Sequence, residues 1–147
     1  MTRQRLLLAY ENADCLKIYG SVLEFAGYEV ALAESGDRAL ATLTGSAFDL
    51  LITDLYLSGA DDQCFVRRVK RQTSWAHLPI IVLTGWSTAP HRRLALEEGA
   101  DLFLPMPLGP RQLLQAVRDL LGPGEEGDPT VPPTPGGDQA AAPTSAP

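Results

Sequence analysis

Asp54 is the residue of this sequence best placed to carry out chemistry, because it directly follows a buried apolar run. Residues 48–53 have the composition of a strand in a parallel sheet, and Asp54 would stand at the carboxyl end of that strand. Two later apolar runs end at Thr84-Gly85 and at Met106-Pro107. In open α/β sheets, ligands bind in the crevice at the carboxyl ends of the strands. A carboxylate, a hydroxyl and an X-Pro step at three strand ends therefore predict a phosphoryl-accepting pocket.

The elements that must position these residues alternate between short strands and amphipathic helices. The expected strands cover residues 5–9, 28–33, 48–53, 80–83 and 101–104. The expected helices cover residues 13–26 and 37–43, and three more begin near Asp62, Pro90 and Pro110. Gly27 and Gly99 stand where glycine commonly ends a helix. Five such units predict a doubly wound five-stranded parallel sheet, since parallel neighbours require right-handed crossovers.

The 147 residues are enough for one folded domain and a tail. We expect residues 1–121 to form the domain and residues 122–147 to be a disordered, acidic Pro/Gly/Ala-rich tail. The tail has 12 prolines and glycines in 26 positions and neither Lys nor Arg. All 12 basic residues and 14 of the 18 acids lie in the domain, whose net charge is then only −2. The acidity of the chain is therefore no argument for a basic partner.

Composition also excludes several classes of function. The domain has no basic stripe, so we expect no binding to nucleic acid. The chain has no signal peptide and no membrane-length apolar run, which favours a cytoplasmic protein without membrane contact. Cys15 and Cys64 lack metal-ligand spacing and are expected to be reduced. His77 and His91 have no acidic or cysteine companions at ligand spacing and are expected at the surface.

Residues 3–121 resemble the receiver domain of two-component response regulators, which has a flavodoxin-like fold. The resemblance rests on several ordered features rather than on one motif. These features are the turn Tyr10-Glu11-Asn12, Asp54, Thr84-Gly85, and Phe103 three residues before Met106-Pro107.

The resemblance implies a role for most of these residues. Asp54 would accept a phosphoryl group from a histidine kinase, a phosphotransfer protein or a small phosphodonor. Glu11, Asp54 and the backbone carbonyl of Tyr56 would hold Mg²⁺. Thr84 would contact the phosphoryl group, and Phe103 would be the aromatic residue that reports the phosphorylation state. Glu11 could instead be an ordinary acid at the N-terminus of a helix, with no metal to bind. Phe103 could instead be an ordinary aromatic residue of the core.

The rim of the pocket follows from the same comparison. Gly85 would leave room for a phosphoryl group, and Tyr56 and Trp86 would flank the mouth and restrict water. Pro107 keeps the family's turn after the last strand, where the preceding peptide bond is often cis; Met106-Pro107 is therefore a candidate cis bond.

Two positions depart from the family pattern. Tyr10 stands where the family has a second metal-binding acid, so we expect weakened Mg²⁺ binding. Met106 stands where the family has a phosphate-binding lysine, and a thioether carries no charge and donates no hydrogen bond. Arg111 lies too far along the chain to replace that lysine with confidence. The phosphorylated pocket, with roughly two more negative charges, would therefore depend on the metal alone.

The best hypothesis is a single-domain response regulator with a degenerate pocket. It would not be an enzyme, apart from phosphoryl acceptance and slow self-dephosphorylation. Output would pass to a downstream protein partner that docks on the face of the fourth helix, fifth strand and fifth helix. A homodimer through this face is a further expectation. The charged residues of this face are Arg92, Arg93, Glu97, Arg111 and Arg118.

Three alternative functions would use these residues differently. A phosphorylation-independent pseudo-receiver would be only a protein-binding module, which Tyr10 and Met106 favour. A dehalogenase-type phosphatase would need a second acid two residues after Asp54, where Tyr56 stands. A dinucleotide or flavin binder would need glycines in the turn after the first strand, and this turn has none.

Overall fold

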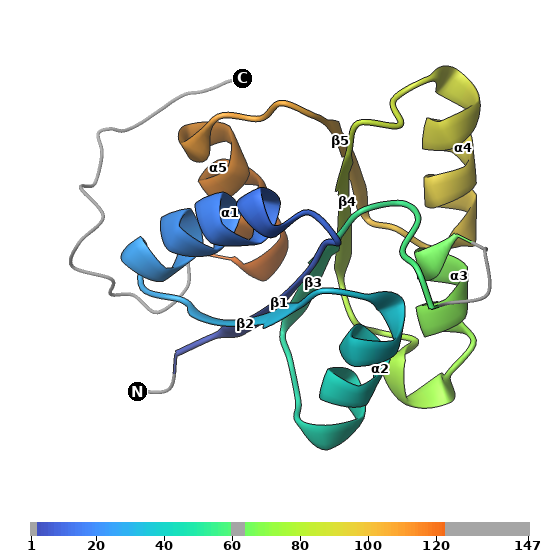
Figure 1. The fold of residues 1–147 in the computed structure, drawn as a ribbon, viewed down its shortest axis with the longest axis horizontal. Coiled ribbons are helices and arrows are strands. Elements are labelled where there is room, and N and C mark those ends of the chain that lie inside the picture. Colours follow the sequence, from blue (N-terminus) through green and yellow to red (C-terminus); the bar gives the residue numbers. More distant parts are fainter. Residues whose placement is uncertain (1–2, 60–63, 123–147) are drawn as a thin grey trace.

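The computed structural model describes residues 3–59 and 64–122, and its centre is one parallel sheet of five strands (Figure 1). The strands are β1 (Arg5–Ala9), β2 (Glu29–Ala33), β3 (Leu50–Thr53), β4 (Ile80–Thr84) and β5 (Leu102–Pro105). Their order is β2-β1-β3-β4-β5, and each neighbouring pair is parallel. The direction of winding reverses between β1 and β3, and such a reversal places a crevice at the carboxyl ends of these two strands.

The connecting helices begin and end at residues suited to those positions. They are α1 (Ala13–Phe25), α2 (Gly36–Gly45), α3 (Phe65–Lys70), α4 (Ala89–Glu98) and α5 (Pro110–Leu121), with a short 3₁₀ helix η1 (Thr73–Trp75) after α3. Side-chain oxygens of Asn12, Ser35 and Thr88 accept backbone N–H groups at the starts of α1, α2 and α4. Gly27 and Gly99 follow α1 and α4 with φ of 105° and 122°, which glycine adopts without strain.

The helices cover both faces of the sheet, so the strands are buried on each side. Helices α1 and α5 lie on one face, and α2, α3 and α4 lie on the other (Figure 1). Side chains of β1 alternate between these layers: Leu7 packs with the α2–α4 layer, while Leu6 and Leu8 pack with α1 and α5. This doubly wound, flavodoxin-like arrangement confirms the fold class expected from the sequence.

A few local features differ from the sequence-based expectation. Strand β3 begins at Leu50 rather than at residue 48, and the exposed Asp49 carboxylate accepts the Arg5 backbone N–H at 2.8 Å. Helix α3 begins at Phe65, whereas the expected start at Asp62 lies outside the described residues. Cys64 precedes α3 and forms an isolated bridge with Tyr56 instead of lying in a helix.

Helix α5 is the last helix of the described chain. Helix α5 ends at Leu121, the last residue of the expected domain, and residues 123–147 lie outside the described residues. Cys15 and Cys64 are both free, as expected. None of the helices in the described ranges is long and apolar enough to cross a membrane.

Candidate functional site

Asp54 lies at the carboxyl edge of the sheet, immediately after β3, as the sequence predicts. Its backbone N–H donates to Ala9 O at the end of β1, which fixes the residue between two strands. Its half-buried carboxylate accepts two hydrogen bonds at Oδ1, from the Leu55 backbone N–H at 2.8 Å and from the Thr84 hydroxyl at 2.5 Å. No residue of the described ranges donates to Oδ2. One carboxylate oxygen is therefore held in place by two hydrogen bonds, and the other accepts none from the described residues.

Thr84 and Gly85 end β4 beside this carboxylate. The Thr84 side chain is fully buried, and its hydroxyl oxygen also accepts the Trp86 backbone N–H at 3.1 Å. A Cβ atom built on Gly85 would meet no heavy atom of the described residues within 4 Å. The hydroxyl is thus aimed at Asp54 by the loop that follows it, and open space lies beside it.

Tyr10 belongs to the core rather than to the edge of the pocket. It is 1% exposed, and its hydroxyl donates to Leu83 O on β4 at 2.5 Å. Burial, and to a lesser degree the negative charge of Asp54, raise the pKa of Tyr10 well above its usual value. A neutral phenol that is already hydrogen-bonded to β4 supplies no metal ligand.

Glu11 is the acid that the turn after β1 does present. Its side chain is exposed, and its carboxylate accepts the Ser58 backbone N–H at 2.5 Å. This bond draws Glu11 toward the loop after β3, which also contains Asp54 and Tyr56. The sequence predicted the carboxylate at this edge but gave no sign of its partner, because Ser58 is 47 residues away.

Three aromatic rings gather above the ends of β3 and β4. The Tyr56 and Trp86 rings meet edge to face with centroids 5.6 Å apart. His91 joins them, 5.4 Å from Trp86 and 6.3 Å from Tyr56. Its Nδ1 is 2.7 Å from the Thr88 hydroxyl. His91 is half-buried and His77 is exposed; the expectation of a surface residue did not include the contacts of His91 with these two rings.

The end of β5 supplies the remaining predicted residues. Phe103 is 7% exposed and packs in the core with α2–α4. Met106 is half-buried against the α1/α5 layer, and its backbone N–H donates to Thr84 O at 2.9 Å. The Met106-Pro107 peptide bond is cis, and Pro107 is exposed. Position 106 therefore lies beside Thr84 and brings an uncharged side chain there.

The site is acidic, with no compensating cation among the described residues. The ion pairs of the described ranges, Arg5–Glu29, Arg38–Glu34 and Arg67–Glu98, include neither Asp54 nor Glu11. Arg111, which lies too far along the chain to be a confident replacement for the lysine, is exposed on α5.

The oxygen ligands at this site are of the type that Mg²⁺ prefers. Within residues 3–59 and 64–122, no group of three His, Cys, Asp or Glu side chains could hold a metal ion. Mg²⁺, however, needs only one or two carboxylates when waters and phosphate oxygens complete its shell. Asp54 and Glu11 meet that smaller requirement.

Comparisons with known proteins agree on one family. The family model described as the response regulator receiver domain matches residues 6–118. The phosphate regulon transcriptional regulatory protein PhoB of Pseudomonas aeruginosa is 33% identical over 128 residues. That match covers 85% of this chain and 56% of PhoB, so the chain spans little more than half of this relative.

Solved structures give the same result for the fold. The chemotaxis protein CheY4 of Vibrio cholerae has a TM-score of 0.74 at 25% identity, covering 81% of this chain and 99% of CheY4. The receiver domain of the sensor histidine kinase PA1611 from Pseudomonas aeruginosa PAO1 has a TM-score of 0.74 at 24% identity, covering 82% of this chain and 99% of that domain. That domain was solved with a magnesium ion coordinated in its active-site cleft.

Proposed function

The chain belongs to the family of receiver domains of two-component response regulators, and we propose that Asp54 is the residue on which it accepts a phosphoryl group. The observation that carries this proposal is the bond between the Thr84 hydroxyl and the Asp54 carboxylate, with open space at Gly85 beside it. The donor would be a histidine kinase or a phosphotransfer protein, the partners with which receiver domains interact.

The hydrogen bonds at Asp54 suggest which oxygen reacts. Oδ1 is held by Thr84 and Leu55, so Oδ2 is the nucleophile. Oδ2 forms a bond to phosphorus while the bond from phosphorus to the donor imidazole nitrogen breaks, and that nitrogen keeps the electron pair. Such a transfer needs position and charge neutralisation more than covalent help from the protein. The residues around Asp54 supply the position.

Receiver domains bind Mg²⁺ in this site, and here Glu11, Asp54 and the Tyr56 backbone carbonyl would hold it. The bound ion would offset negative charge on the phosphoryl oxygens. We propose that the affinity for Mg²⁺ is lower than usual for the family, because Tyr10 is a buried neutral phenol at the position of the second acid. The Glu11 carboxylate also accepts the Ser58 N–H, so it would be shared between the ion and that hydrogen bond.

The missing cation at position 106 weakens the phosphorylated state further. A phosphoryl group adds about 1.5 to 2 negative charges to a pocket that already holds two carboxylates. Met106 contributes no charge there. The phosphoprotein should therefore be short-lived, or should form only at high donor concentration, and Phe103 would switch only during that time.

Output would pass through contact with another protein. Receiver domains are signalling modules that are generally not enzymes, and slow self-dephosphorylation is the most that we propose for this one. The exposed charges of α4 and α5 form the proposed docking face and the proposed dimer face. They are Arg92, Arg93, Glu97 and Arg111, with the half-buried Arg118. In this proposal residues 1–121 act as a receiver domain in the cytoplasm, without nucleic-acid or membrane contact.

A phosphorylation-independent pseudo-receiver is the second candidate. The feature that favours it is Tyr10, whose hydroxyl is committed to Leu83 O in the core. In that case the same α4–β5–α5 face would bind its partner without a phosphoryl group.

Intact-mass analysis after incubation with a small phosphodonor and Mg²⁺ separates the two candidates. We expect one added phosphoryl group in the wild type and none in Asp54→Asn. Thr84→Ser keeps the hydroxyl and should be modified, whereas Thr84→Val should be modified less. An unmodified wild type under conditions that fully phosphorylate a known receiver would favour the pseudo-receiver.

A further inference from the structure

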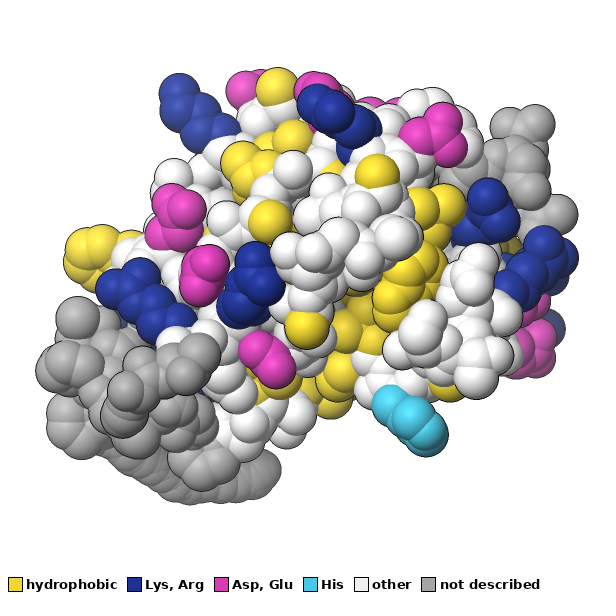
Figure 2. All heavy atoms as spheres, turned by 90° about the horizontal axis from the view of Figure 1, so that it is seen from below, with side chains coloured by type: hydrophobic (Ala, Val, Ile, Leu, Met, Phe, Trp, Pro, Cys, Tyr) yellow, Lys and Arg dark blue, Asp and Glu magenta, His cyan; other side chains and the backbone are white. Residues whose placement is uncertain are grey.

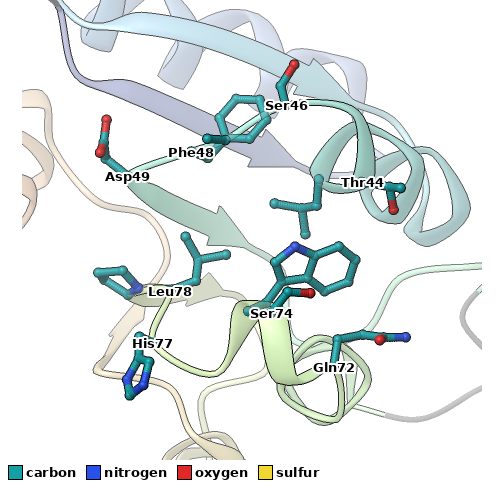
Figure 3. A pocket seen from close by; sticks show the side chains of 12 residues that line it. Thr44, Ser46, Phe48, Asp49, Gln72, Ser74, His77 and Leu78 are labelled. Carbon is teal, nitrogen blue, oxygen red and sulfur yellow. The ribbon is translucent and has the colours of Figure 1, made fainter.

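A groove lies at the edge of the sheet opposite Asp54, where β3 and β4 begin. It has a volume of about 730 Å³ and lies between the end of α2 and the segment that contains η1. Figure 3 shows Phe48, Leu78 and several polar side chains around the opening. Figure 2, which views the molecule from below Figure 1, shows a band of hydrophobic side chains on that face. The pocket at Asp54 uses none of these residues.

The groove combines aromatic side chains with unused polar groups. Phe48 and Trp75 line it and are only partly buried against the core. The Trp75 indole N–H donates to no described residue, and the side chains of Gln72, Ser74 and His77 also make no hydrogen bond within the described ranges. Several recognition domains bind proline-rich segments in the polyproline II conformation in aromatic-lined grooves. The backbone carbonyls of that conformation have no internal partners.

The same chain contains a segment of this kind. Pro129, Pro132 and Pro135 recur at intervals of three residues, in the sequence Pro-Thr-Val-Pro-Pro-Thr-Pro. Polyproline II has three residues per turn, so this repeat would bring the three prolines onto one edge of the helix. Residues 129–135 in that conformation would span about 19 Å.

The segment can reach the groove. Helix α5 starts at the Asp54 edge and runs back along the sheet, so its end at Leu121 lies at the edge where the strands begin (Figure 1). Seven residues separate Leu121 from Pro129, and an extended chain of that length spans up to about 25 Å. The path must cross the edge of the sheet from the α1/α5 layer to the α2–α4 layer, and because neighbouring layers stack about 10 Å apart, the two spacings come to about 20 Å.

One cation stands beside the groove, although it already pairs with Glu29 at 3.5 Å and the acid Asp49 also lines the groove. Glu125, Glu126 and Asp128 precede the prolines. Arg5 stands at one end of the groove: its guanidinium lies 4.8 Å from the Phe48 ring centroid and donates to Ala47 O at 3.0 Å. The acidic residues would therefore pass a cation before the prolines reach the groove.

We propose that the groove lined by Phe48 and Trp75 binds residues 129–135 of the same chain as a polyproline II segment. The short connection keeps the segment at an effective concentration of the order of millimolar, so even a weak intrinsic affinity gives substantial occupancy. The site lies at the sheet edge opposite Asp54 and does not depend on phosphoryl acceptance.

Trp75 allows a direct test in the full-length chain. The sequence has two tryptophans, so Trp86→Phe leaves Trp75 as the only indole. In this background Pro129, Pro132 and Pro135 are replaced together by Ala. A matched control replaces three prolines outside the repeat: Pro123, Pro143 and Pro147. We expect the repeat variant to show red-shifted Trp75 emission and a higher acrylamide quenching constant, while the control behaves like its parent.

Further measurements identify the occupant. A peptide of residues 128–136, added at millimolar concentration to the repeat variant, should restore the parent's emission and quenching. The difference between parent and repeat variant should survive dilution, because the contact is within one chain. Equal emission in parent and repeat variant, or an equal shift in the control, would overturn the proposal. Loss of the difference on dilution would also overturn it, since the tail of a second copy would then be the occupant.

Discussion

Replacing Met106 with lysine should restore the cation that this pocket lacks. The Met106 backbone is tied to Thr84 O, so a side chain at this position starts beside the hydroxyl that contacts Asp54. The methionine side chain is half-buried against the α1/α5 layer, and a lysine stem can lie along the same apolar surface with its ammonium toward the carboxylates. The acidic surroundings should tolerate the new charge.

The size of the effect follows from the bond that would form. A hydrogen bond to a charged group contributes about 1.5–3 kcal/mol. That range corresponds to a roughly 10- to 150-fold change in an equilibrium ratio. The ratio of phosphorylated to unmodified protein, measured by intact mass at equal donor and Mg²⁺, should therefore rise by about this factor in Met106→Lys.

Met106→Gln is the matched control, because glutamine has a similar length and no charge. It should behave like the wild type if charge is what the pocket lacks. Equal ratios in Met106→Lys and Met106→Gln would refute the reasoning, and Arg111 would be the first candidate for the group that already supplies the charge. If every variant stayed unmodified, the buried Tyr10 would be the more serious departure from the family pattern.

Three further predictions concern other contacts. Tyr10→Phe should lower the free energy of unfolding by about 1–3 kcal/mol in chemical denaturation, because the buried carbonyl on β4 loses its donor. The hydrogen bond from Arg67 holds the pKa of Glu98 in the folded protein below its usual value. The stability that this pair contributes is therefore complete above the pKa that Glu98 has in the unfolded chain, and it is lost as the pH falls through the lowered pKa of the folded protein. Unfolding curves of wild type and Glu98→Gln should therefore differ by up to about 1 kcal/mol at neutral pH, for this partly exposed pair, and converge in acid. Glu11→Gln should weaken Mg²⁺ binding followed by Trp86 fluorescence, and an unchanged affinity would mean that Glu11 is not a ligand.

Much of the fold was predictable because local signals and the periodicity of apolar residues agree. Gly27 and Gly99 marked helix ends that the structure confirms, and Pro110 marked the first residue of α5. The start of β3 was placed two residues too early, because Phe48 is as apolar as a strand residue. The contact of Phe48 with Arg5 joins residues distant in sequence, and no local pattern contains it.

The candidate site was predictable in composition but not in its bonds. Asp54, Thr84 and Met106 lie at one edge because parallel strands have their carboxyl ends together, and the alternation of strands and helices predicts a parallel sheet. The inward direction of Tyr10 depends on an acceptor on β4, which is a tertiary contact. The contacts of His91 with Tyr56 and Trp86 are also tertiary, because α4 meets the loops after β3 and β4 only in the folded protein.

Locating the phosphoryl group on the chain tests the central claim most directly. After incubation with a phosphodonor, borohydride reduction converts an aspartyl phosphate to homoserine and so marks the modified residue for peptide mapping. We expect homoserine at position 54 and at no other position, because within residues 3–59 and 64–122 Asp54 is the acid whose carboxylate accepts the Thr84 hydroxyl. Modification of Glu11, Asp61 or Asp62 while Asp54 stays unmodified would contradict the account.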